Sequence, residues 1–147
     1  MMTPATAPPV TELASRARLA VMRLARRLRQ QTDTEVTPSQ ISALFATERL
    51  EPVTLGDLAA AERIQPPSMT RVVAGLEDAG LVSRESDASD RRIARLRLTA
   101  DGRRVLDRSR SRKTAYLAAR LRRLPQDDLD ALEHAVGVIE RLLEAEP

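Results

Sequence analysis

The sequence predicts a mainly α-helical fold with a small β wing, and three observations between residues 54 and 99 predict it. Two short helical patterns are joined by a tight turn at Arg63-Ile64-Gln65. Gly80 follows the second pattern as a left-handed helix stop. Two strand-like runs come next, at 81–85 and 93–98, and the loop between them is rich in turn-forming residues. In this order, the elements are those of a winged helix-turn-helix, with further helices on both sides.

The amino-acid composition of the chain favours some classes of binding partner over others. The chain has 147 residues, the length of one domain, and 42% of them are hydrophobic. Only Phe45 and Tyr116 are aromatic, so stacking on unpaired bases has almost nothing to use. The net charge is only +3, but nearly every basic residue is arginine. Planar guanidinium groups suit the phosphates and guanine edges of double-stranded DNA better than they suit a membrane.

Several classes of site are disfavoured by what the chain lacks. It has no cysteine, and the single His134 cannot form a metal cluster alone, so we expect no metal and no cofactor. It also has no glycine-rich phosphate loop and no carboxylate pair in an apolar setting, so we expect no catalytic residues and no enzyme activity. The N-terminus does not resemble a signal peptide and no apolar stretch is long enough to cross a bilayer, which favours a cytoplasmic location.

The N-terminal third is expected to hold an arm and two helices. Residues 1–9 contain three prolines and should form a flexible arm, and residues 10–36 should form a dimerisation segment with one long amphipathic helix to about Gln31. The arginines of this helix are interpreted first as a solvated face and, alternatively, as a DNA contact. Thr37-Pro38-Ser39-Gln40 has the pattern of a capping box and should start a second helix, which runs to about Leu50.

Residues 37–99 are expected to form the winged helix-turn-helix domain. Thr54 should cap the third helix, with contact to a phosphate as a possible second role. Gly56 inside that helix suggests a close approach by a neighbouring helix. The fourth helix starts at Pro66-Pro67, and its inward stripe is Met69, Val72, Val73 and Leu76.

The outward side of the fourth helix carries the first set of candidate DNA-binding residues. A recognition helix places the residues near its N-terminus against base edges in the major groove. The candidates at those positions are Pro67, Ser68, Thr70 and Arg71. Arg71 can bind guanine bidentately or hold a phosphate. The alternative is that these residues are ordinary helix surface.

The wing carries the second set of candidates. Arg91 or Arg92 is expected to enter the minor groove, where narrow A·T tracts concentrate negative potential. Arg84, Arg95 and Arg97 are expected near the DNA backbone. In the second strand, Ala94, Leu96 and Leu98 are expected on one packed face. Asp90 would repel a phosphate if it were free, so it is expected to pair with an arginine and hold the shape of the loop.

Residues 100–147 are expected to form C-terminal dimerisation helices. Thr99 should cap a helix over about 100–123, and Leu124-Pro125 interrupts it. In the last helix, apolar residues spaced three and four apart form a coiled-coil seam. This seam packs either within the chain or, as we favour, against a second copy. The expected dimerisation residues are Leu13, Ala17, Leu129, Leu132, Val136, Ile139 and Leu143.

The segment DRRIARLRLTADG at 90–102 resembles the wing signature of the MarR (multiple antibiotic resistance regulator) family of bacterial transcription factors, and PPSMTRVVAGLEDAGLV at 66–82 resembles the family's recognition helix and its exit. The resemblance implies a homodimer held by terminal helices, two winged domains on a pseudo-palindromic operator, and an Asp90–Arg92 pair. The family's peroxide sensors use a reactive cysteine, which this chain lacks.

From these residues and this resemblance we expect a sequence-specific, ligand-responsive DNA-binding regulator, most often a repressor in such families. Its partners would be double-stranded DNA, itself, and a small-molecule effector, with Arg16, Arg23 and Arg112 as candidates to line the effector cleft. The alternative is a winged-helix module that only binds proteins, since fold does not dictate function. Such a module has no need of arginines on the wing.

Overall fold

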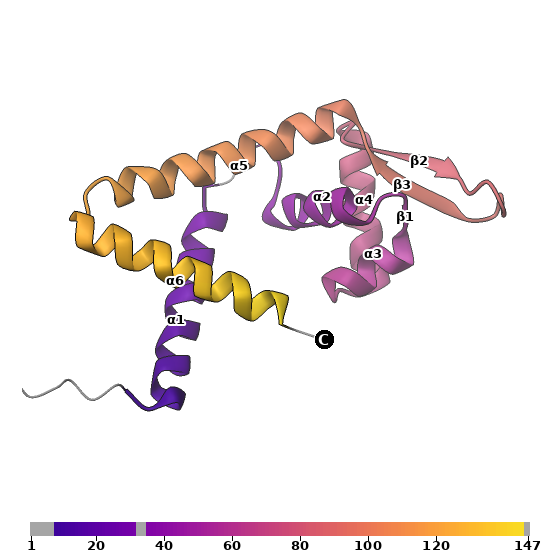
Figure 1. The fold of residues 1–147 in the computed structure, drawn as a ribbon. Coiled ribbons are helices and arrows are strands. Elements are labelled where there is room, and N and C mark those ends of the chain that lie inside the picture. The colour runs from indigo at the N-terminus through magenta and orange to yellow at the C-terminus, as the bar shows by residue number, and fades with distance from the viewer. Residues whose placement is uncertain (1–7, 32–34, 146–147) are drawn as a thin grey trace, which may run out of the picture. The chain divides into compact units, whose positions relative to one another are not determined.

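The fold described here is that of residues 8–31 and 35–145 in a computed structural model, which forms six helices and three strands over these ranges (Figure 1). The chain divides into two compact units, one ending at Lys113 and one beginning at Thr114. Most of the expected N-terminal arm lies outside the described residues. The elements in chain order are α1 (Val10–Arg29), α2 (Pro38–Leu50), β1 (Val53–Thr54), α3 (Leu55–Glu62), α4 (Pro66–Asp78), β2 (Val82–Ser86), β3 (Ala94–Leu98), α5 (Ala100–Leu121) and α6 (Gln126–Glu144).

Helix starts and stops follow the signals in the sequence. The Thr37 hydroxyl accepts the Gln40 amide while the Gln40 side chain accepts the Thr37 amide, which completes the predicted capping box of α2. The Thr54 hydroxyl accepts the Asp57 amide at 3.1 Å and caps α3. Gly80 has a φ of 71°, as a left-handed stop requires. Thr99 accepts the Gly102 amide at 3.0 Å at the start of α5.

The sheet has three antiparallel strands in the order β1-β3-β2, and β2 and β3 form the hairpin at one end of the first unit (Figure 1). Val82 lies opposite Leu98 and Arg84 opposite Leu96, so this face of the hairpin meets the core at its base. Strand β1 was not predicted, because its two residues are too few to show an alternating pattern. Ala94 was expected on the packed face but is exposed, since the hairpin extends beyond the core at that point.

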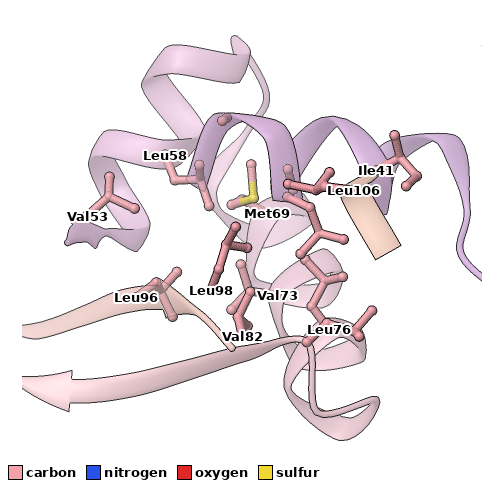
Figure 2. Close-up of a cluster of buried hydrophobic side chains, with 14 of the residues drawn as sticks. Ile41, Val53, Leu58, Met69, Val73, Leu76, Val82, Leu96, Leu98 and Leu106 are labelled. Carbon is pink, nitrogen blue, oxygen red and sulfur yellow. The ribbon is translucent and has the colours of Figure 1, made fainter. Parts of the chain in front are cut away.

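The core of the first unit joins α2, α3, α4, the sheet and the first turns of α5 (Figure 2). Met69, Val73 and Leu76 of α4 are fully buried, as the predicted inward stripe requires, and Val72 packs against them at its margin. The buried aliphatic side chains of this cluster fix α4 against α3 and against the sheet. The outer face of α4 is thereby turned away from the core.

Two glycines explain how closely α5 and α4 approach their neighbours. A Cβ on Gly102 would lie 2.1 Å from the carbonyl oxygen of Leu81, and one on Gly75 would lie 2.8 Å from Nε2 of Gln40. The prediction of a close approach at Gly56 was wrong, because a Cβ added there would meet no atom within 4 Å.

Helices α1 and α6 have no buried residues, although both carry apolar stripes. Side chains of the α6 seam are exposed, with Val136 at 44%, Ile139 at 43% and Leu143 at 66%. The predicted domain boundaries at residues 36, 99 and 100 remain predictions. Among the described residues, no helix is long and apolar enough to cross a membrane.

Candidate nucleic-acid interface

The turn between α3 and α4 sets the angle of the candidate recognition helix. Arg63 ends α3 in a left-handed conformation with a φ of 54°, and its amide bonds the Ala60 carbonyl. Pro66 and Pro67 then occupy the first turn of α4, where a missing amide hydrogen costs nothing. A non-glycine residue keeps this left-handed conformation only where the surrounding structure imposes it.

All four candidate residues on α4 are exposed. Pro67, Ser68, Thr70 and Arg71 lie within the first two turns of the helix, on the side away from buried Met69 and Val73. The Thr70 hydroxyl donates to the Pro66 carbonyl at 2.9 Å, so its oxygen is left to accept a hydrogen bond rather than to donate one. The Arg71 guanidinium forms no ion pair or hydrogen bond with any residue the structure describes.

The loop at the tip of the wing is organised by two aspartates. Asp90 accepts Nε and Nη2 of Arg92 at 3.1 and 3.0 Å, and also the Arg92 amide. This is the pair that the family pattern implied. Asp87 accepts the backbone amides of Ser89 and Asp90 with one oxygen and Nε of Arg95 with the other, at 2.8 Å. These bonds close the loop on itself and tie it to β3.

The two aspartates titrate at unusually low pH because of these bonds. Hydrogen bonds from Ser89 and then Arg95 lower the pKa of Asp87 from 3.8 to about 2. The Arg92 side chain, and then its amide, lower the pKa of Asp90. The same pairing raises the pKa of Arg92. Both carboxylates are therefore charged, and the loop is bonded, over the whole physiological range.

Three further wing arginines have carboxylate partners. Arg84 donates to Glu77 of α4 at 2.8 Å and so links β2 to the last turns of that helix. Arg97 donates to Glu85 across the hairpin, on the face that also carries Arg95. In these pairs the hydrogen bond uses Nε, as it does in the Arg95–Asp87 pair, so the terminal nitrogens have no bond to a described residue.

Arg91 differs from the other wing arginines. It is exposed at the tip and has no ion pair or hydrogen bond with a described residue. The candidate interface therefore contains two guanidinium groups without internal partners, Arg71 on α4 and Arg91 on the wing. The others are oriented by carboxylates of the same unit.

The sequence predicted Asp90 but not the other carboxylates that orient the interface. Asp87 had a signal, because Asp followed two residues later by Ser is a common turn-capping pattern. Glu77 and Glu85 had no such signal in the sequence, because their pairing with arginine depends on the tertiary fold and on the strand register.

Glu51 was missed for the same reason. Its side chain accepts the Leu98 amide at 2.7 Å and pairs with Arg103, joining the end of α2 to the base of the wing. Burial opposes ionisation of Glu51, but these bonds outweigh it and lower its pKa.

In the described part of the chain, no group of three or more His, Asp or Glu side chains could hold a metal ion. His134 is exposed on α6. The geometry offers the exposed outer face of α4 and a hairpin, with guanidinium groups on both.

Comparisons with known proteins agree with this geometry. A model of the MarR family matches residues 36–94, from just before α2 to the start of β3. An uncharacterised HTH-type transcriptional regulator of Mycobacterium leprae is 40% identical over 136 residues, which cover 92% of this chain and 95% of the relative. An HTH-type transcriptional regulator of Mycobacterium tuberculosis is 38% identical over the same coverage.

Solved structures show the same architecture. One from Pseudomonas aeruginosa, described as a transcriptional regulator protein, is 31% identical with a TM-score of 0.79, over 93% of this chain and 96% of that one. A mutant of Staphylococcus aureus MepR bound to an oligodeoxyribonucleotide has a TM-score of 0.65 at 18% identity, over 89% and 97% of the two chains, and is a likeness of fold. The fold and its exposed helix define a winged helix-turn-helix protein of the transcription-factor class. By its relatives, the chain belongs to the MarR family of transcriptional regulators.

Proposed function

We propose that this regulator is a homodimeric repressor that binds a pseudo-palindromic operator in double-stranded DNA and releases it when a small molecule binds. The observation that carries DNA binding is the pair of unpartnered guanidinium groups, Arg71 on the outer face of α4 and Arg91 at the wing tip. Both are exposed, and a charged group without an internal partner is available to a phosphate or a base edge without breaking an existing pair.

On DNA, α4 would enter the major groove and the hairpin would reach the adjacent minor groove. Arg71 would bind guanine bidentately, Ser68 would bond a base edge or a phosphate, Thr70 would accept a hydrogen bond from a base edge, and Pro67 would contact a thymine methyl. Because Thr70 already donates to Pro66, its oxygen suits an amino group of adenine or cytosine. Arg91 would enter the minor groove, and the Asp90–Arg92 pair would hold the loop that presents it.

The paired arginines would act at the DNA backbone. The terminal nitrogens of Arg84, Arg95 and Arg97 can each meet a phosphate while Nε keeps its carboxylate. Thr54 would donate to a phosphate the hydroxyl hydrogen that its cap leaves free. Each phosphate contact would weaken binding at all sequences when lost and reduce the salt slope by about one.

Two binding units are needed to read a pseudo-palindrome, and the exposed seams of α1 and α6 are where we propose the copies join. The proposed contact residues are Leu13 and Ala17 in α1 and Leu129, Leu132, Val136, Ile139 and Leu143 in α6. Exposed apolar stripes on two long helices are the support for this proposal.

For the effector we propose a small anion at a pocket of about 130 Å³ in the first unit. Its lining residues are Arg29, Pro38, Ile41, Ser42, Phe45 and Lys113. Burial and the charge of Arg29 lower the pKa of Lys113, so an anion between the two cations would relieve their repulsion. Arg112 and the α1 arginines Arg16 and Arg23, the earlier candidates, do not line this pocket.

The test begins by capturing DNA fragments from a genomic library with the purified protein. The captured duplex is then titrated with wild type and with Arg71→Ala, Arg91→Ala and Arg92→Ala. Arg122→Ala, in the turn between α5 and α6, is the control for a lost charge outside the interface. We expect the first three to lose at least tenfold in affinity, and Arg122→Ala to bind as wild type does. No captured DNA, or equal affinity in all variants, would contradict the proposal and favour a module that binds proteins.

A further inference from the structure

Two helices of the first unit, α3 and α4, end in the same backbone motif. At the end of α4, Gly80 has a φ of 71° and its amide donates to the Glu77 carbonyl at 2.9 Å. The next amide, that of Leu81, donates to the Leu76 carbonyl at 2.9 Å. These two bonds form a Schellman motif, and glycine is the usual residue at its left-handed position because it has no Cβ to clash.

The end of α3 repeats this motif with an arginine in the left-handed position. Arg63 has a φ of 54° and a ψ of 41°, and its amide donates to the Ala60 carbonyl at 3.2 Å. The Ile64 amide donates to the Ala59 carbonyl at 3.1 Å. A Cβ makes this conformation unfavourable, so arginine destabilises a turn that glycine would form freely. Non-glycine residues in such conformations cluster at functional sites, which indicates a role for the Arg63 side chain.

The Arg63 side chain has no polar partner within the fold that would offset this cost. It is exposed, and its guanidinium forms no ion pair or hydrogen bond with any residue in the described ranges. The neighbouring carboxylate, that of Glu62, accepts the hydroxyl of Ser42 in α2 instead. Arg63 is therefore, like Arg71 and Arg91, a charged group that is available to a partner outside the chain.

The place of Arg63 in the chain is beside the start of the recognition helix, two residues before Gln65, the N-cap of α4. In a helix-turn-helix on DNA, the recognition helix enters the major groove and the preceding helix crosses the backbone, so the turn between them lies beside phosphates. A helix N-terminus usually holds a phosphate with free amides. The first turn of α4 offers none, because Pro66 and Pro67 have no amide hydrogen and the Ser68 amide donates to the Gln65 carbonyl at 3.0 Å.

We propose that Arg63 is a further DNA-binding residue, which holds a phosphate at the edge of the major groove in place of the amides that Pro66 and Pro67 lack. This inference rests on the DNA binding by α4 proposed above, and it adds the turn between α3 and α4 to the interface. A guanidinium can donate two parallel N–H bonds to a phosphate. Such a contact carries no sequence information, so it fixes the position of α4 in the groove rather than the base that α4 reads.

Arg63→Gly in the full-length chain tests the proposal, because it removes the guanidinium and gives the turn the residue that its backbone favours. We expect its urea midpoint of unfolding to be at or above that of wild type. Its affinity for the captured operator should fall by about tenfold or more, because a charge-assisted hydrogen bond is lost in each half-site. Its affinity for an unrelated duplex should also fall, and the slope of log affinity against log salt should lessen by about one for each bound protomer.

Two further variants control for charge and for position. Arg63→Lys keeps the positive charge but cannot bind a phosphate bidentately, so its salt slope should equal that of wild type and its affinity should lie between those of wild type and Arg63→Gly. Arg122→Gly makes the same substitution at an exposed arginine in the turn between α5 and α6, in the second unit. It should bind both duplexes as wild type does.

Three results would overturn the role of Arg63 and leave the proposed function standing. Equal affinity and equal salt slope in wild type and Arg63→Gly would show that Arg63 does not contact DNA. A loss of affinity confined to the operator would assign Arg63 to a base rather than to a phosphate. A lower unfolding midpoint in Arg63→Gly would show that the side chain stabilises the turn. Failure of wild type to bind any duplex, by contrast, would overturn the proposed function as well.

Discussion

Replacing Gly102 by alanine tests how the wing is joined to α5. The new Cβ would lie 2.1 Å from the carbonyl oxygen of Leu81 and 3.4 Å from Cδ2 of Leu98. The oxygen is a backbone atom that also accepts the Thr99 amide at 3.1 Å, so it cannot rotate away as a flexible side chain could. Relief of the contact requires α5 or the start of β2 to move by about 1 Å, since Cβ atoms essentially never lie closer than 3.0 Å to such an atom.

The expected cost can be built from three contributions. Overpacking a close-packed site lowers the free energy of unfolding by about 1–3 kcal/mol, and a weakened Thr99–Leu81 hydrogen bond lowers it by about 1 kcal/mol more. Alanine forms helices better than glycine, which raises the free energy of unfolding by up to about 1 kcal/mol. We therefore expect Gly102→Ala to lower the free energy of unfolding by about 1–4 kcal/mol.

Gly56→Ala is the matched control for this change. It makes the same substitution in a helix of the same unit, but the added Cβ meets nothing within 4 Å. We expect it to raise the free energy of unfolding by about 0.5–1 kcal/mol. Urea unfolding followed by circular dichroism, at one protomer concentration, measures both variants. Equal stability of the two alanine variants would refute the close approach at Gly102.

Two further predictions concern the carboxylates that shape the interface. Asp87 should titrate with a midpoint near its pKa of about 2, measured by the NMR shifts of the Ser89 and Asp90 amides. The stabilisation from the ionised carboxylate is complete above the ordinary pKa of 3.8 and is lost as the pH falls through the lower pKa. A midpoint near 3.8 would argue against the loop network. Glu51→Ala should lower the free energy of unfolding by about 1–3 kcal/mol, because it leaves the Leu98 amide without its acceptor. Glu51→Gln keeps an acceptor oxygen and should lose less stability in the same urea assay. Equal losses in the two variants would assign the effect to the lost pair with Arg103 instead.

The fold could be predicted where the signal is local. The capping box at Thr37, the paired prolines that open α4 and the left-handed stop at Gly80 each depend on a few neighbouring residues, and each is confirmed. The inward stripe of α4 follows from helical periodicity alone. The two-residue strand β1 could not be predicted, because its pairing with Leu96 and Arg95 is set by the tertiary fold.

The candidate site could be predicted in part. The Asp90–Arg92 pair is local and was implied by the family pattern. The partners of Arg84 and Arg97 lie seven and twelve residues away, on α4 and across the hairpin, so only the structure reveals them. A glycine in a helix signals a close approach only when something lies over it, which is why Gly102 fits that interpretation and Gly56 does not.

Whether the outer face of α4 reads bases is measured by a double-mutant cycle, in which each base pair of a captured operator is substituted in turn and titrated with wild type and Arg71→Ala. We expect one base pair in each half-site whose substitution costs wild type about 1–3 kcal/mol and costs Arg71→Ala nothing further. If every substitution weakens both proteins equally, Arg71 does not read a base.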